Sequence, residues 1–256
     1  MTRILPPWRT LLPPEHGAWF MLGFPLVLGL LLRPGLPSFL LALAAMGAFL
    51  ARPPLRRVLN GQRDGGAQMR ALALLGGLAL ALSASVFLIS GPRFLIPALA
   101  VSPLVIVALW ADAKRAVRSF PVELSAQGAF AGLAAAMVTA GGGTLLEGGR
   151  VWLFVLLVGG ANLAHVRRML GHARQMAIEE LDRRLGLVHG LHLLLLAASV
   201  ALLARHGWSG PAWIAWTLLL YGRALLPYRP LPARILGWRE GGLSVLGLLI
   251  LWRALL

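Results

Sequence analysis

The chain has 256 residues, of which 58% are hydrophobic and only 13% are charged, and its mean hydropathy is +0.77. A soluble domain typically carries about 25% charged residues, so this chain has too little charge to cover a water-exposed surface. The formal net charge of +15 comes from basic residues that lie between apolar runs, which indicates lipid head groups rather than nucleic acid as partners. Because the chain has no cysteine, disulfides, thiolate nucleophiles and cysteine-ligated metals are excluded.

Apolar runs follow one another along the whole chain, each near the length of about 20 residues that a membrane-spanning helix requires. Pro, Gly or Arg bounds each run, and none shows the alternating polar positions of a membrane β-strand. We therefore predict an all-α, polytopic bundle of about nine transmembrane helices that forms one integral membrane domain over residues 1–256, with eight spans as the alternative. The nine runs are residues 17–32, 36–51, 71–90, 94–111, 124–141, 151–166, 185–204, 211–226 and 241–256.

The basic residues test this division, since loops on the cytoplasmic side of a membrane carry the excess of Lys and Arg. If the connections are numbered alternately from a cytoplasmic amino terminus, all but five of the 24 Lys and Arg residues fall on the inside. Each outside segment holds a single one, namely Arg33, Arg93, Arg150, Arg205 and Arg253. This regularity predicts a multi-pass protein of a bacterial inner membrane with its amino terminus in the cytoplasm.

Aromatic and small residues give two further expectations. Trp19, Trp110, Trp152, Trp238 and Trp252 lie near predicted span ends, where tryptophan favours the membrane interface. The fifth run carries Gly128 and Gly132 followed by three alanines at 134–136. Small residues allow close helix packing, which indicates that this run lies at the centre of the bundle.

Polar residues beside a span are candidates for function, because ionisable groups are costly in lipid. The first group is Glu15, His16 and Trp19 at the start of the first run, where a helix amino terminus favours a carboxylate. A helix cap with an interfacial anchor is the structural alternative. A second group, Asp112 and Lys114, follows the fourth run, and Glu240 opens the ninth.

Two similar arginine segments follow the second and sixth runs. Both read Arg-Arg-apolar-Leu and have a third Arg four residues after the Leu; they comprise Arg56, Arg57 and Arg63, and Arg167, Arg168 and Arg174. On a helix, residues seven apart share a face, and arginine binds phosphate or carboxylate in a bidentate manner. The segments could therefore converge on an anion, or simply mark inside loops.

Histidines add two smaller possibilities. Asn162 and His165 lie on the last turn of the sixth run beside Gly159 and Gly160, where hydrogen bonding between helices or contact with a ligand can occur. His189 and His192 share a face of the seventh run and could ligate haem only with a partner histidine at the same depth. No phosphate-binding Gly loop and no zinc spacing is present, so no metal is predicted, and the cofactor is not determined.

The segment Pro14-Glu15-His16-Gly17-Ala18-Trp19, followed by Phe24-Pro25-Leu26 and Gly29, resembles the signature of the YwiC-like bacterial membrane proteins. Three later segments agree with that family: Arg52-Pro53-Pro54-Leu55, His165-Val166-Arg167, and Ile235-Leu236-Gly237 with Glu240. The family implies an integral membrane protein but no activity.

A more distant similarity is to the UbiA-type prenyltransferase superfamily, which implies nine helices and a cytoplasm-facing cavity between the loops after the second and sixth helices. Those loops carry the paired arginine segments here. The superfamily holds magnesium with Asp-rich motifs, whereas this chain has Asp64 in the first loop and Glu179, Glu180 and Asp182 downstream in the second. Paired hard oxygen ligands for magnesium are therefore lacking.

These observations lead to one hypothesis and two rivals, and they do not decide whether the protein is an enzyme. The hypothesis is a divergent UbiA-like protein that binds an isoprenoid, quinone or other amphipathic ligand in a basic, cytoplasm-facing cavity. Its candidate ligand-binding residues are Glu15, His16, Trp19, Arg52, Arg56, Arg57, Asp112, Lys114, Asn162, His165, Arg167, Arg168 and Glu240. The rivals are a transporter of small solutes or anions, although no run has a Pro-Gly break at its centre, and an accessory protein of a respiratory complex.

Overall fold

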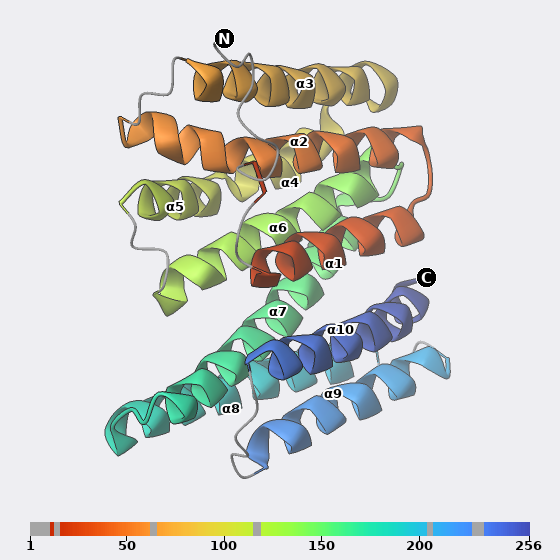
Figure 1. Ribbon diagram of the computed structural model, residues 1–256. Helices are drawn as coiled ribbons and strands as arrows, with labels where there is room; N and C mark the ends of the chain where they lie inside the picture. The colour runs from red at the N-terminus through yellow and green to blue at the C-terminus, as the bar shows by residue number, and fades with distance from the viewer. Residues whose placement is uncertain (1–10, 13–15, 62–65, 115–118, 204–206, 227–232) are drawn as a thin grey trace. The chain divides into compact units, whose positions relative to one another are not determined.

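The computed structural model describes residues 11–12, 16–61, 66–114, 119–203, 207–226 and 233–256. Within these ranges the chain is helical and contains no strand (Figure 1). The helices are α1 (His16–Leu32), α2 (Leu36–Leu59), α3 (Ala67–Ser90), the 3-10 turn η2 (Pro92–Phe94), α4 (Leu95–Ala100), α5 (Ser102–Ala113), α6 (Phe120–Ala140), α7 (Leu145–Ala173), α8 (Ile178–Leu203), α9 (Ser209–Leu225) and α10 (Ala233–Leu255). Each of the nine predicted runs coincides with one helix or, for the fourth run, with the α4–α5 pair, so the all-α prediction is confirmed.

The helices have the length and composition of membrane spans. Six of them within the described residues are long and apolar enough to cross a membrane, and the α4–α5 pair makes seven if it counts as one span. α1 is shorter, with an apolar part at Ala18–Leu32. α3 is largely apolar, yet only Ala67, Gln68, Ala71 and Val86 of its residues are buried, as expected of a helix that lipid surrounds. The protein is a multi-pass membrane protein, and the total of nine crossings stays a prediction.

The fourth run is interrupted near its middle. α4 ends at Ala100, α5 begins at Ser102, and the two parts are bent by 53°. Pro103 has no backbone N–H to continue the helical ladder across the break, and the carbonyl of Val101 instead accepts the N–H groups of Leu104 and Val105. The run has no Pro-Gly pair at its centre, so the break at Val101 is not predicted from the sequence.

The chain divides into two compact units, Met1–Arg150 and Val151–Leu256, and the boundary falls inside α7. In unit 1, α6 packs against α1, α2, α4 and α5, and α2 packs against α3 (Figure 1). The core comprises residues from α1, α2, α3, α6 and the 3-10 turn, among them Leu22, Leu41, Phe49, Val86 and Met137. In unit 2, α9 packs against both α8 and α10.

Small residues place α6 at the centre of unit 1, as the sequence predicts. A Cβ atom at Gly132 would lie 2.5 Å from the side chain of Val101, so only glycine allows α6 to approach the break between α4 and α5 this closely. Ala131, Ala134 and Ala135 are buried on the same helix. α6 therefore packs by small-residue contact, the mechanism that operates between helices in lipid.

The connection from α6 to α7 is built by glycine and a capping box. The N–H of Gly143 donates to the carbonyl of Val138, and the N–H of Gly142 donates to the carbonyl of Thr139. Gly142 has a left-handed φ of 87°, which this helix-ending motif requires. Thr144 and Glu147 then exchange hydrogen bonds, with Glu147 accepting the Thr144 N–H at 2.6 Å, which starts α7. Glu147 also accepts a bond from Arg33 at 2.9 Å, so the ends of α1 and α7 are tied together.

Tryptophans divide between the bundle surface and its interior. Trp110 and Trp238 are more than half exposed and lie near helix ends, in keeping with the predicted interfacial role. Trp19 instead contacts Phe49 edge-to-face with ring centroids 5.0 Å apart, at the rim of the unit 1 core. In unit 2, Trp213 is fully buried, stacks on Trp216 and donates to the hydroxyl of Ser199 at 2.9 Å.

Candidate functional site

Unit 1 contains a buried carboxylate that two arginines approach. Asp112, in the last turn of α5, is 3% exposed. The Nε of Arg52 on α2 donates to its Oδ2 at 2.8 Å, and Nη1 of Arg56, one helical turn further along α2, lies 3.6 Å from its Oδ1. The second distance is an ion pair without a hydrogen bond, and Oδ1 has no hydrogen-bond partner. We call Asp112, Arg52 and Arg56 the Asp112 cluster; it carries one more positive than negative charge.

The sequence of α2 explains where this cluster forms. Arg52 precedes Pro53 and Pro54, both of them buried inside the helix. Neither proline can donate to the carbonyl four residues earlier, so the carbonyls of Phe49 and Leu50 lose their helical donors. α2 nevertheless continues to Leu59, and this extension places Arg52 and Arg56 on one face toward α5.

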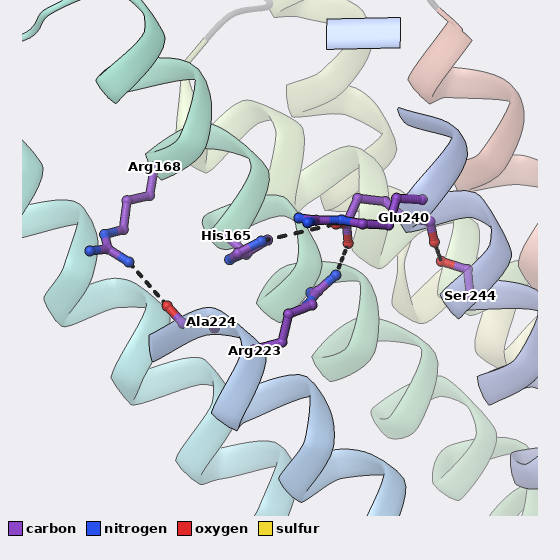
Figure 2. A network of polar contacts seen from close by, with 7 residues as sticks. His165, Arg168, Arg223, Ala224, Glu240 and Ser244 are labelled. Carbon is purple, nitrogen blue, oxygen red and sulfur yellow. Dashed lines mark hydrogen bonds and ion pairs between the residues drawn. The ribbon is translucent and has the colours of Figure 1, made fainter. Parts of the chain in front are cut away.

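Unit 2 contains a larger cluster around Glu240 on α10, which is 5% exposed (Figure 2). Arg223 of α9 forms an ion pair with Oε2, and Arg239 approaches Oε1 at 3.3 Å. Nε2 of His165 on α7 lies 4.0 Å from Oε1, and Figure 2 shows the imidazole pointing toward this carboxylate. Because three helices contribute ionisable groups to one position, the arrangement depends on how α7, α9 and α10 pack.

Arg168 belongs to the same region. It lies one turn after His165 on α7, and its Nη1 donates to the carbonyl of Ala224 on α9 at 3.0 Å (Figure 2). The neighbouring residue on α9 is Arg223. We call His165, Arg168, Arg223, Arg239 and Glu240 the Glu240 cluster. Three arginines and one carboxylate give it two more positive than negative charges when the histidine is neutral.

Several nitrogens of the Glu240 cluster are buried without a hydrogen bond. They are both ring nitrogens of His165, the Nε of Arg168 and the Nε of Arg223. His165 is only 1% exposed. Buried polar groups in native proteins almost always have partners, and a buried donor without one costs about 1–3 kcal/mol. The cluster therefore has more donors than acceptors, so an added acceptor would stabilise it.

A second histidine group lies on α8 in the same unit. Nδ1 of His189 is 2.8 Å from the hydroxyl of Tyr221, and the ring of His192 stacks on Tyr221. Nδ1 of His192 is 2.8 Å from the carbonyl of Val188, so it carries the proton and leaves Nε2 as a buried acceptor without a partner. The two histidines share a face, as predicted, and both contact Tyr221; ligation of haem stays a prediction.

The structure brings six predicted residues into the two clusters: Arg52, Arg56, Asp112, His165, Arg168 and Glu240. Arg57 is half-buried and makes no ion pair with a described residue, whereas Lys114 is exposed at the end of α5. Asn162 is half-buried on α7, and the backbone carbonyl of Arg167 accepts a bond from Arg184 at 2.7 Å. Glu15, Arg63 and the side chain of His16 lie outside the described residues. Arg56 and Arg167 belong to different units, so convergence of the paired segments stays a prediction.

Sequence reasoning missed Arg223, Arg239 and Tyr221. The sequence offers one signal for the two arginines: Glu240 is the only acidic residue after Asp182. The arginines nearest to it in sequence are Arg223, Arg229, Arg234 and Arg239. Choosing among them requires the packing of α9 on α10.

The acidic residues are the possible hard oxygen ligands for a metal ion in this protein. Among the described residues, no group of three or more His, Asp or Glu side chains is arranged to hold a metal ion. Glu180, downstream of the second arginine segment, is paired with Arg183 and with Arg184, the latter at 2.9 Å. Asp64 lies outside the described residues.

The amino-terminal part of the chain matches a known family. Residues 12–138, just under half of the chain, match the model of the family described as YwiC-like protein. The match contains the Asp112 cluster and the Arg52–Leu55 segment, while the Glu240 cluster lies beyond it. No curated protein and no solved structure matches the chain. Over residues 12–138 the chain is therefore similar to the YwiC-like family, in agreement with the resemblance of the motif at its amino terminus.

Proposed function

We propose that this membrane protein binds an amphipathic molecule, such as an isoprenoid or quinone derivative, and holds its anionic or polar head with arginines at the cytoplasmic side of a bacterial inner membrane. The observation that carries the proposal is the same in both units. A buried carboxylate is outnumbered by arginines, two to one at Asp112 and three to one at Glu240.

The physical argument is charge balance. A charge that is removed from water needs an opposite charge or strong hydrogen bonds, and intramembrane charges mark ligand or ion sites by default. Arg52 and Arg56 each keep part of their side chain exposed, whereas Arg223 is 12% exposed. An anionic head with several oxygens would neutralise the excess charge and accept bidentate bonds from the guanidinium groups.

Removal of two arginines tests the proposal. In Arg56→Ala/Arg167→Ala, Asp112 remains paired with Arg52, so the fold is expected to persist while each unit loses one predicted head-group donor. We expect the purified double variant to retain less than about a third of the lipid-soluble ligand that wild-type protein carries through detergent exchange, measured by mass spectrometry of an organic extract. Arg150→Ala/Arg253→Ala removes the same charge from predicted outside positions and is the control. Unchanged retention in the first variant would contradict the proposal.

The orientation that the proposal assumes has its own test. The chain has no cysteine, so single-cysteine variants can be made without first replacing native cysteines. Asn60, at the end of α2, and Leu145, at the start of α7, are both exposed. In intact cells, a membrane-impermeant maleimide is expected to label Leu145→Cys and to label Asn60→Cys only after the inner membrane is permeabilised. Labelling of both positions from one side would overturn the proposed orientation.

Transport of a small solute is a second candidate, and the break between α4 and α5 favours it. Transporters commonly place broken helices at their substrate sites, and this pair is bent by 53°. The charged clusters, however, lie at Asp112 and Glu240 and not at Val101. Time-dependent uptake of a charged solute into proteoliposomes would favour transport over ligand binding.

A further inference from the structure

The Glu240 cluster in unit 2 has a composition that specifies the head group more narrowly than the proposed function does. It combines an excess of two positive charges with four buried nitrogens that lack a partner. Two of these nitrogens belong to His165, which is 1% exposed and whose ring points toward Glu240 (Figure 2). These are independent observations, since the first concerns charge and the second concerns hydrogen bonding.

We infer that the Glu240 cluster binds the phosphate monoester group of a lipid, with His165, Arg168 and Arg223 as its donors. The inference rests on the proposed function and names the class of head group. Its basis is the juxtaposition, on α7, α9 and α10, of a buried imidazole without a hydrogen bond to a described residue and three arginines, two of which pair with the carboxylate of Glu240.

Charge selects the monoester. A phosphate monoester carries about −1.5 to −2 charges near pH 7, which matches the excess of two positive charges. A carboxylate or a phosphodiester carries one negative charge and would leave one positive charge of the cluster without a counter-charge. Neutral or zwitterionic head groups would leave both excess positive charges without a counter-charge. The cluster should therefore distinguish lipids that differ only in the substitution of the phosphate.

Hydrogen bonding selects an oxygen-rich group. Neutral imidazole has one N–H donor and one acceptor nitrogen, and neither forms a hydrogen bond with a described residue. A monoester oxygen can accept from the N–H of His165 and from the Nε groups of Arg168 and Arg223. Glu240 keeps Arg223 and Arg239 in position through its own ion pairs, so it acts as a positioning residue beside the head group.

The test uses purified full-length protein in nanodiscs or detergent with three lipids of identical acyl chains: phosphatidic acid, phosphatidylglycerol and phosphatidylcholine. We expect phosphatidic acid to bind at least about tenfold more tightly than phosphatidylglycerol, as measured by native mass spectrometry and by the shift in melting temperature. Phosphatidylcholine should produce no shift. Inorganic phosphate is the fourth arm: stabilisation by phosphate without a response to phosphatidic acid would support the oxyanion chemistry and assign it to a soluble source.

A variant pair separates binding from folding. His165→Leu removes both unpartnered nitrogens with little change in volume, so the lipid-free protein should melt no lower than wild type while its affinity for phosphatidic acid falls at least about tenfold. Arg183→Gln removes a basic group that is exposed in unit 2, and it should bind phosphatidic acid as wild type does.

Two results overturn the inference. They are equal binding of phosphatidic acid and phosphatidylglycerol, and wild-type affinity in His165→Leu. If either occurs while Arg56→Ala/Arg167→Ala still loses its ligand, the proposed function survives and only the monoester assignment fails. If neither the variants nor the lipids alter binding, both fail.

Discussion

Glu240→Gln is expected to lower the free energy of unfolding by about 3–5 kcal/mol, because it removes one partner of a buried ion pair and leaves the other uncompensated. Glutamine keeps the size of the side chain, so the effect is electrostatic. Arg223, which pairs with Glu240 and is 12% exposed, cannot reach water readily, and Arg239 loses the same partner. The measurement is the unfolding midpoint in mixed detergent micelles titrated with SDS, followed by circular dichroism.

Two further variants test whether the loss of stability in Glu240→Gln comes from the buried ion pair. Glu179→Gln removes the same charge from an exposed position of α8 and should change stability by no more than about 0.5 kcal/mol. Glu240→Gln/Arg223→Gln removes both partners and should be more stable than Glu240→Gln alone, since no buried charge loses its neutraliser at that pair. If Glu240→Gln is as mild as Glu179→Gln, the Glu240 cluster is not buried in the membrane-embedded protein.

Asp112→Asn is expected to cost about 1–3 kcal/mol in the same assay, less than the change at Glu240. The carboxylate is buried, but Arg52 and Arg56 are 28% and 35% exposed, so both arginines can regain water or lipid head groups when the charge disappears. Asparagine keeps an oxygen that can still accept from Arg52, which limits the loss further.

The arginines of α2 provide a graded control for this cluster. Arg52→Gln removes the hydrogen bond at 2.8 Å and should have the largest effect of the three, and Arg56→Gln removes the longer contact at 3.6 Å and should have a smaller one. Arg57→Gln, which removes no ion pair with a described residue, should be close to neutral. An equal effect at the three positions would show that charge in general, and not contact with Asp112, determines stability here.

The positions of the helices follow from the sequence because each span satisfies its own backbone. In lipid, every backbone N–H and C=O must be bonded internally, so a run of about 20 apolar residues between Pro, Gly or Arg has few alternatives to a helix. All nine predicted runs are helical for this reason. The ends were less predictable: α2 continues through Pro53 and Pro54 to Leu59, and α7 continues to Ala173, because amphipathic ends can extend a helix beyond its apolar part.

The break at Val101 shows the limit of reasoning from one run at a time. The fourth run is apolar and long enough to span, and Pro97 and Pro103 are compatible with a kinked but continuous helix. The bend of 53° occurs where α6 presents Gly132 to Val101. Room for the bent backbone thus comes from another helix, and no property of residues 94–111 alone reveals it.

For the candidate site, the sequence by itself determined which residues are chemically unusual: Asp112, His165 and Glu240 are ionisable groups beside apolar runs, and that is costly wherever the helices lie. Tertiary structure decided which arginine each acid meets. Asp112 lies 60 residues from Arg52, and Glu240 pairs with Arg223 across 17 residues. Ion pairing acts over a few ångströms, so its partners depend on the packing of α2 with α5 and of α9 with α10, which spacing along the chain does not specify.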